Sequence, residues 1–184
     1  MDACRPEPVS ALEKAAVLRS LPAEGAATHF STGERRKLEE LGPVLCSQSR
    51  KDVYDVRIIT VPQAYTGLHA RAVLLISMPV LVLLTSEELQ ALVAHEIGHE
   101  YVWQQYESAK TRKDAKRLRE LELVCDAIAI ATLIRLGVPP ARLESATEKI
   151  DSYNREWFGT ALDEDNYPSL RERTQLIKKV RRNP

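Results

Sequence analysis

The first quarter of the chain has the apolar spacing of two short helices. Apolar residues recur every three or four positions over residues 10–21, which predicts an amphipathic helix that ends at Pro22. Ser31 and Glu34 have the spacing of a capping box, so a second, more highly charged helix is expected to begin there. Gly42 and Pro43 are expected to end it.

Residues 53–84 change to a pattern typical of strands. Residues 53–61 alternate and are rich in β-branched side chains, which predicts a strand. Residues 72–77 are almost entirely apolar, which indicates a second strand covered on both faces. Residues 63–70 between them are expected to form a loop or an irregular edge segment. Residues 80–84 fit a third strand or a single helical turn, and periodicity cannot distinguish the two.

The second half of the chain reads as helices. Thr85 and Glu88 form another capping box, after which a helical apolar stripe continues without a breaker to about residue 108. Thr111 with Asp114 is expected to cap a further helix that runs to residue 136 and stops at Gly137. Two more helices are expected, over residues 140–157 and after Pro168. Strands followed by long helices predict an α+β fold.

The helix that Thr85 opens carries His95-Glu96-Ile97-Gly98-His99, an HExxH sequence. Histidines four residues apart project from one face of a helix, one turn from each other. Two neutral imidazoles so placed can bind one Zn²⁺, with Glu96 beside them as a general base for a zinc-activated water. The sequence therefore predicts one zinc ion per chain at His95 and His99.

Helix geometry proposes Glu122 as the third zinc ligand. If the motif helix runs to about residue 109, it ends about 15 Å beyond His99, and a helix beginning near Thr111 needs about 16 Å to return to Glu122. The two helices would form an antiparallel hairpin with Glu122 level with His99. Asp126 lies one turn further on the same face and could accept the second N–H of a ligating imidazole. The alternative is that both acids lie on a solvated helix face.

Composition narrows the possible partners. The chain has 26 basic and 26 acidic residues, so its total charge indicates neither nucleic acid nor an anionic membrane as a partner. The basic run over residues 110–119 is interpreted as the solvated end of a helical hairpin rather than an anion site. The longest uncharged run, residues 72–86, contains Pro79 and is too short to span a membrane.

The N-terminal residues and the cysteines favour a cytoplasmic location. The charged N-terminus has no apolar segment typical of a signal peptide, although a trimmed signal would leave a periplasmic or secreted location open. Cys4, Cys46 and Cys125 have no CxxC spacing, which argues against a cysteine zinc cluster and favours free thiols.

Taken together, these motifs resemble those of the gluzincin peptidase family that contains the HtpX heat-shock protease, the CAAX prenyl protease and the soluble minigluzincins. That family has HExGH followed by ExxAD, a capped acidic start to the motif helix, and a later HPxxxxR signature. The matching segments here are residues 85–89, 95–99, 122–126 and 168–173. The resemblance covers roughly residues 53–175 and is closest to the compact soluble members, since the transmembrane helices of the others are absent.

The chain departs from the family pattern at three positions. Cys125 replaces an alanine, which is a small-for-small change. Tyr167 replaces the histidine before Pro168, so a role of that histidine in metal or transition-state binding cannot be transferred. Gln63 replaces an asparagine that often opens the strand beside the substrate, whereas Ala64 and the aromatic residue after it are retained.

The resemblance implies a zincin-like fold, a small and mostly antiparallel sheet beside the two ligand-bearing helices. One domain is expected, with a helical segment (1–50), a catalytic core (53–136) and a second helical segment (138–184). The implied activity is that of a zinc metalloendopeptidase acting on a protein or peptide, which would add as a strand near residues 63–72.

The identity of the group that stabilises the oxyanion is less explicit in the sequence. The family comparison makes Arg173 and Tyr167 the candidates for this role, with Arg173 alternatively steadying the site carboxylates. Two other functions stay open: a repressor-cleaving peptidase of the ImmA/IrrE type, and a zinc-stabilised binding module without activity, for which Glu96 would be unnecessary.

Overall fold

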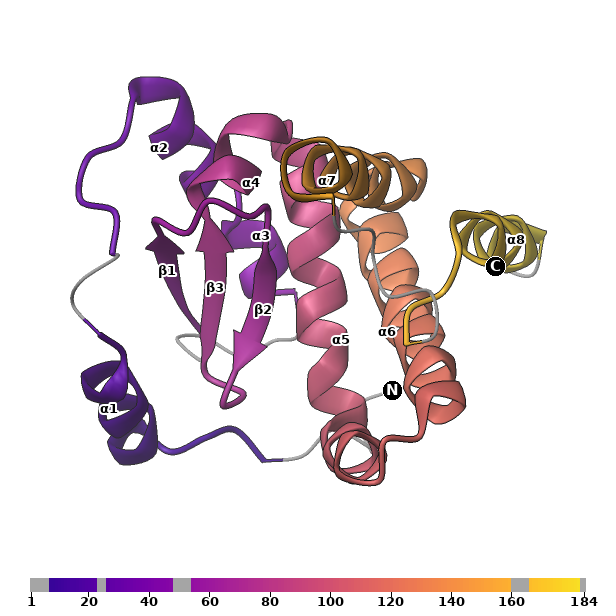
Figure 1. Ribbon diagram of the computed structural model, residues 1–184. Helices are drawn as coiled ribbons and strands as arrows, with labels where there is room; N and C mark the ends of the chain where they lie inside the picture. The colour runs from indigo at the N-terminus through magenta and orange to yellow at the C-terminus, as the bar shows by residue number, and fades with distance from the viewer. Residues whose placement is uncertain (1–6, 23–25, 48–53, 160–165, 183–184) are drawn as a thin grey trace.

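A three-stranded sheet lies beside a long helical hairpin in the computed structural model, which describes residues 7–22, 26–47, 54–159 and 166–182 (Figure 1). The strands are β1 (Asp55–Ile59), β2 (Thr66–His69) and β3 (Val73–Ser77). The helices are α1 (Ala11–Ser20), α2 (Thr32–Glu39), α3 (Gly42–Leu45), α4 (Met78–Leu83), α5 (Ser86–Thr111), α6 (Ala115–Leu136), α7 (Ala141–Phe158) and α8 (Leu170–Arg182). The predicted α+β class is confirmed.

The sheet has the order β1-β3-β2 and is mixed rather than mostly antiparallel. β3 pairs in parallel with β1 and in antiparallel with β2, so that Ile76 lies between Ile58 and Thr66. β3 takes the centre because almost all of its side chains are apolar and buried, as predicted for a strand covered on both faces. The chain leaves β1, passes β3 to form the edge strand β2, and returns through a hairpin.

The segment expected to be a loop or an irregular edge segment contains β2, which is a regular strand at the edge of the sheet. β2 and β3 are joined by Ala70, Arg71 and Ala72, and the φ angles of 46° at Ala70 and 59° at Arg71 put both residues in the left-handed region. Asparagine and glycine are the usual residues in such a turn. The alanine and arginine used here gave no hairpin signal in the sequence.

The capping boxes fixed the starts of the helices. Both predicted boxes are present, and Thr85 and Glu88 begin α5 as expected. Asp114 alone caps α6 by accepting from the backbone N–H of Arg117. Thr111 is instead the last residue of α5, and its hydroxyl donates to the carbonyl of Glu107.

Three other helix boundaries differ from or refine the sequence-based expectations. Gly42 and Pro43 do not only end a helix, because they form the first turn of α3, where a proline in the first turn is tolerated. Residues 80–84, for which strand and helix stayed open, belong largely to α4. The helix expected at Pro168 begins two residues later, at Leu170. The preceding residue, Ser169, caps it through reciprocal hydrogen bonds with Glu172.

The main core lies between the sheet and the helices α5, α6 and α7. α5 is buried along most of its first half, and it runs beside β2 in Figure 1, with α6 on its other side and α7 across its upper end. Glu88 in its first turn is buried and accepts hydrogen bonds from Ser145 (2.6 Å) and Lys149 (2.8 Å), which tie α7 to α5. α5 and α7 are therefore held together by the side chain of Glu88.

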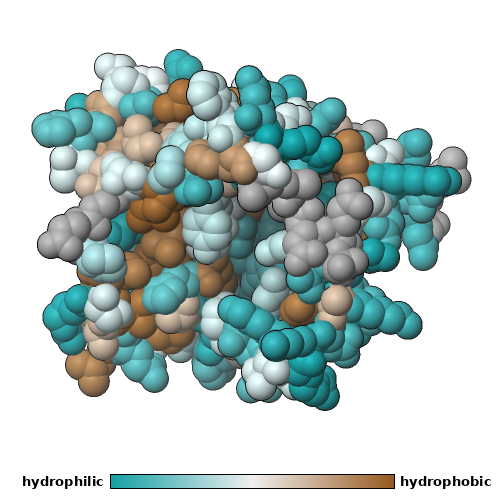
Figure 2. All heavy atoms as spheres, viewed as in Figure 1, coloured by the Kyte–Doolittle hydropathy of each residue, from teal (hydrophilic) through white to brown (hydrophobic). Residues whose placement is uncertain are grey.

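The far end of the α5–α6 hairpin is hydrophilic. Residues 111–114, 116 and 117 are exposed there, and Figure 2 is largely teal over this part of the surface. The exposure agrees with the interpretation of the basic run as a solvated helix end. None of the described helices is both long and apolar enough to cross a membrane.

Candidate metal centre

Helix α5 presents His95 and His99 on its side facing α6, one turn apart. Their rings meet edge to face with centroids 5.1 Å apart. His95 is only 5% exposed, so its ring is almost removed from water. This spacing is the one that the HExxH sequence predicted.

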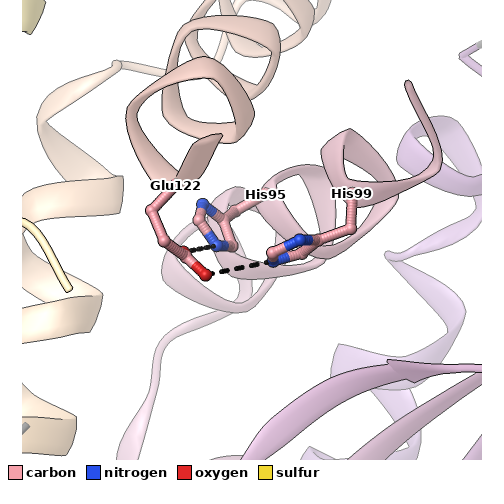
Figure 3. Close-up of side chains that lie close together, drawn as sticks. All are labelled: His95, His99 and Glu122. Carbon is pink, nitrogen blue, oxygen red and sulfur yellow. Dashed lines mark ion pairs between the residues drawn. The ribbon is translucent and has the colours of Figure 1, made fainter. Parts of the chain in front are cut away.

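Helix α6 brings Glu122 to both imidazoles (Figure 3). Its Oε2 lies 3.1 Å from Nε2 of His95, and its Oε1 lies 3.7 Å from Nε2 of His99. One ligand atom from each of the three residues falls within 4.8 Å of the others. The antiparallel hairpin therefore joins the three residues that sequence reasoning nominated as ligands.

Asp126 lies behind His95, one turn along α6 from Glu122. Its Oδ1 is 2.8 Å from Nδ1 of His95, so that the other ring nitrogen faces Glu122. Arg173 of α8 is also buried and donates through a guanidinium nitrogen to the same Oδ1. α8 thus holds the carboxylate that orients the histidine ring.

The pKa values of the metal-free site reflect this crowding of charge. Burial alone would lower the pKa of His95, but the hydrogen bond of its ring to Asp126 and its ion pair with Glu122 outweigh burial and raise the pKa to about 10. Burial would raise the pKa of Glu122, whereas its contact with His95 dominates and lowers the pKa to about 2. Burial, followed by the nearby His95, lowers the pKa of His99, so this imidazole is neutral and ready to ligate.

The donor set fits a divalent metal ion. Oε2 of Glu122 is buried and receives no hydrogen bond from any described residue. A buried carboxylate oxygen without a hydrogen-bond donor is costly unless a cation or another charge faces it. Two imidazoles and one carboxylate are a ligand set of catalytic zinc sites, in which the fourth position is open to water or substrate.

Glu96 stands at the boundary between this cluster and an open cleft. The cleft has a volume of about 640 Å³ and is lined by β2, α5, α7 and the segment before α8. The hydroxyl of Thr66 on β2 donates to Oε1 of Glu96 at 2.8 Å. Oε2 of Glu96 lies 4.0 Å from Nε2 of His99. Glu96, which is not one of the three candidate ligands, therefore presents its carboxylate to the cleft.

Tyr106 is a residue of this site that the sequence analysis missed. Its hydroxyl donates to Oε1 of Glu122 at 2.9 Å, and its ring lies edge-on to His99 with centroids 4.8 Å apart. Burial, and then the charge of Glu122, raise its pKa well above the ordinary value. Tyr106 lies seven residues after His99, hence on the same helix face, and that spacing could have identified it.

Tyr167 lines the cleft, whereas the other candidate histidines lie apart from the cluster. Tyr167 hydrogen-bonds to Tyr106, and burial together with Glu122 and Glu96 raises its pKa to about 12. His69, the last residue of β2, lines the cleft, and neither it nor His29 belongs to the metal-binding group of the described residues.

The cysteines play no part in the ligand set. Cys125 lies between Glu122 and Asp126 and is a buried free thiol whose pKa is raised by burial. Cys46 is free and exposed, and Cys4 lies outside the described residues.

No protein-family model matches the chain, and no curated protein matches it. The resemblance to the gluzincin family therefore depends on the motifs and on the geometry of this site. That geometry supports binding of a metal ion at His95, His99 and Glu122.

Proposed function

We propose that the protein is a zinc-dependent metalloendopeptidase. The observation that carries the proposal is the buried His95–His99–Glu122 cluster with Glu96 beside it at the floor of an open cleft. A site that only stabilised a fold would need neither a free carboxylate next to the ligands nor access for a substrate. Both features are typical of a hydrolytic site.

The ligand residues would hold the metal, and each neighbouring residue would have a defined task. A zinc ion in such a site lowers the pKa of water and polarises a carbonyl group. Glu96 would take the proton of the attacking water and deliver it to the leaving amine. Thr66 would orient Glu96 for this transfer, because its hydroxyl already donates to one carboxylate oxygen.

Asp126 and Arg173 would act through His95 rather than on the substrate. Asp126 fixes the ring direction of His95, and Arg173 neutralises Asp126 in a buried environment. Of the two roles considered for Arg173, the contact with Asp126 favours steadying a site carboxylate. Tyr167 is the better candidate for stabilising the oxyanion, since it lines the cleft and its raised pKa keeps its proton available to donate.

The substrate would be an extended peptide that adds to β2. β2 is an edge strand of the sheet, and its residues line the cleft along its length. Peptides recognised in this way are bound through their backbone, with side-chain pockets at alternate positions. The repressor-cleaving alternative would use the same site on a different substrate.

The proposal is tested by metal content and peptide cleavage measured on the same preparations. We expect about one zinc per chain, cleavage of unfolded casein, and loss of cleavage with a chelator. Glu96→Gln should retain zinc and fold but lose activity by about two to four orders of magnitude, because it removes the base and leaves the ligands. Glu122→Ala should lose zinc as well.

Three results would contradict parts of this proposal. Wild-type turnover in Glu96→Gln would exclude the mechanism, and undiminished zinc in Glu122→Ala would exclude the third ligand. Zinc binding by the wild-type protein without cleavage of any unfolded protein would favour the non-catalytic zinc module.

A further inference from the structure

The edge of β2 that faces the cleft is partly occupied by a side chain of the protein itself. Along an antiparallel strand, the N–H and C=O groups of alternate residues point to opposite sides. The N–H of Tyr65 donates to Oγ of Ser77 and its carbonyl accepts from the N–H of Ser77, so Tyr65 faces β3. Ala64, Thr66 and Leu68 consequently direct their backbone groups to the open side.

Asn154 of α7 takes both backbone groups of Ala64. The N–H of Ala64 donates to Oδ1 of Asn154 at 2.9 Å, and Nδ2 of Asn154 donates to the carbonyl of Ala64 at 2.9 Å. This pair of bonds is the one that a neighbouring strand would make with Ala64. The Asn154 amide therefore replaces one residue of an added strand.

Helix α7 is anchored to its neighbours by several hydrogen bonds, so the position of Asn154 beside β2 is fixed. Glu88 ties the first half of α7 to α5 through Ser145 and Lys149. One residue before Asn154, the hydroxyl of Tyr153 donates to the carbonyl of Pro62 at 3.3 Å. α7 is thus attached both to α5 and to the segment that precedes β2.

We propose that Asn154 closes one end of the β2 edge and restricts a peptide substrate to pairing with Thr66 and Leu68. The inference rests on the proposed peptidase function. A peptide antiparallel to β2 runs from the His69 end toward the Ala64 end, so its C-terminal part meets Asn154. Because Thr66 contacts Glu96, the reacting bond lies near Thr66, and backbone pairing falls on the N-terminal side of that bond.

The consequence is a one-sided specificity. Residues before the cleaved bond are selected through strand pairing with Thr66 and Leu68. Residues after it leave the sheet and contact only side chains that line the cleft, among them Asn154 and Ile150. Asn154 is therefore a specificity-determining residue rather than a member of the reacting groups.

The test is a backbone N-methylation scan of a ten-residue peptide centred on a bond that the zinc-loaded protein cleaves in β-casein. Methylation removes one peptide N–H at a time, and each lost strand bond should lower kcat/KM by about fivefold. In the wild-type protein we expect losses only on the N-terminal side of the cleaved bond. In Asn154→Ala a new loss of about the same size should appear on the C-terminal side, where the peptide can now pair with Ala64.

Ser152→Ala is the matched control, because Ser152 is exposed on the same helix and is not part of the cleft lining. It should reproduce the wild-type scan. Equal losses on both sides in the wild-type protein would overturn the role of Asn154 and leave the peptidase function intact. The same scan in Asn154→Ala as in the wild-type protein would also overturn it. Failure of the zinc-loaded protein to cleave β-casein and other unfolded proteins would overturn the proposed function and this inference together.

Discussion

Gly98 of α5 touches the backbone of Cys125 on α6. A Cβ atom at Gly98 would lie 3.0 Å from Cα and 3.0 Å from the carbonyl oxygen of Cys125. Both atoms belong to a helix backbone, which cannot move aside as the tip of a side chain can. The ligand-bearing helices therefore cross where only glycine fits, and Glu122 and Asp126 flank that crossing on α6.

Gly98→Ala should separate the two ligand helices. The added methyl group must push α6 away, which moves Glu122 from the histidines and lowers zinc affinity by at least about tenfold. The free energy of unfolding should fall by about 1 to 3 kcal/mol, as for an overpacked core. Metal competition with a chelator and urea unfolding measure the two effects.

Gly33→Ala provides the control, because an added Cβ at Gly33 of α2 would come no closer than 4.0 Å to another atom. It should leave zinc affinity unchanged and stabilise the protein by up to about 1 kcal/mol through helix propensity. Equal zinc affinity in Gly98→Ala and the wild-type protein would mean that the crossing does not set the ligand geometry.

Tyr106→Phe should weaken metal binding without disturbing the fold. The hydroxyl of Tyr106 donates a hydrogen bond to Oε1 of Glu122. Oε2 is then the oxygen of this carboxylate without a hydrogen-bond donor among the described residues. Its loss frees the carboxylate to rotate, and such supporting partners change metal affinity by about 10- to 100-fold. Tyr153→Phe removes a hydroxyl that bonds to Pro62 instead and should bind zinc as the wild-type protein does. Identical affinities for the two variants would contradict the role of Tyr106.

Most of the correct predictions from the sequence rest on interactions between residues that are close together in the chain. Ser31 with Glu34 and Thr85 with Glu88 identified helix starts, because a capping box involves only residues three apart. The HExxH spacing and helix rise were sufficient to nominate Glu122, since an antiparallel hairpin leaves little freedom in which residues face each other. These inferences needed no knowledge of the tertiary structure beyond one turn between two helices.

Contacts between segments far apart in the chain could not be predicted. Asn154 bonds to Ala64 across 90 positions, and Arg173 reaches Asp126 across 47. An asparagine in a charged helix gives no indication of its partner, so the closed end of β2 was not visible in the sequence. The parallel pairing of β1 with β3 was missed for a similar reason, because strand order is not specified by local alternation.

The buried carboxylate of Glu88 should make stability depend on acid pH. Burial would raise its pKa, but hydrogen bonds from Lys149, Ser145 and Thr85 outweigh burial and lower the pKa from 4.5 to about 2. A carboxyl group with a lowered folded-state pKa stabilises the fold above its unfolded pKa, and the stabilisation disappears as the pH falls from about 4.5 to about 2. A shift of this size corresponds to a contribution of about 3 kcal/mol at neutral pH.

Urea unfolding of metal-free protein at pH 7 and pH 3 tests this dependence. Glu88→Gln should be destabilised by about 2 to 3 kcal/mol relative to the wild-type protein at pH 7, with a clearly smaller difference at pH 3. Glu87→Gln is the matched control, because its carboxylate is half exposed and pairs with Arg142 at the surface. It should change stability by less than about 1 kcal/mol at either pH. A difference for Glu88→Gln that stays constant with pH would contradict the assignment.

Arg173 differs from its neighbour Arg171 in burial and in contact. Arg173 is 5% exposed and donates to Asp126, whereas Arg171 is exposed on the outer side of α8. Both lie in the first turns of the helix, where the dipole disfavours a cation. The buried arginine is stabilised there by the charge of Asp126, so its side chain connects α8 to the ring of His95.

Arg173→Lys should therefore impair the site, while Arg171→Lys should not. A lysine keeps the charge but loses the planar group that fits the carboxylate, so Asp126 would lose its fixed position and His95 its fixed ring direction. We expect zinc affinity and peptide cleavage to fall by about tenfold or more in Arg173→Lys, with a lower melting temperature. Small and equal effects of the two substitutions on all three measurements would show that α8 does not support the metal centre. A fall in melting temperature alone, with unchanged zinc affinity, would reduce the contact between Arg173 and Asp126 to a role in packing α8.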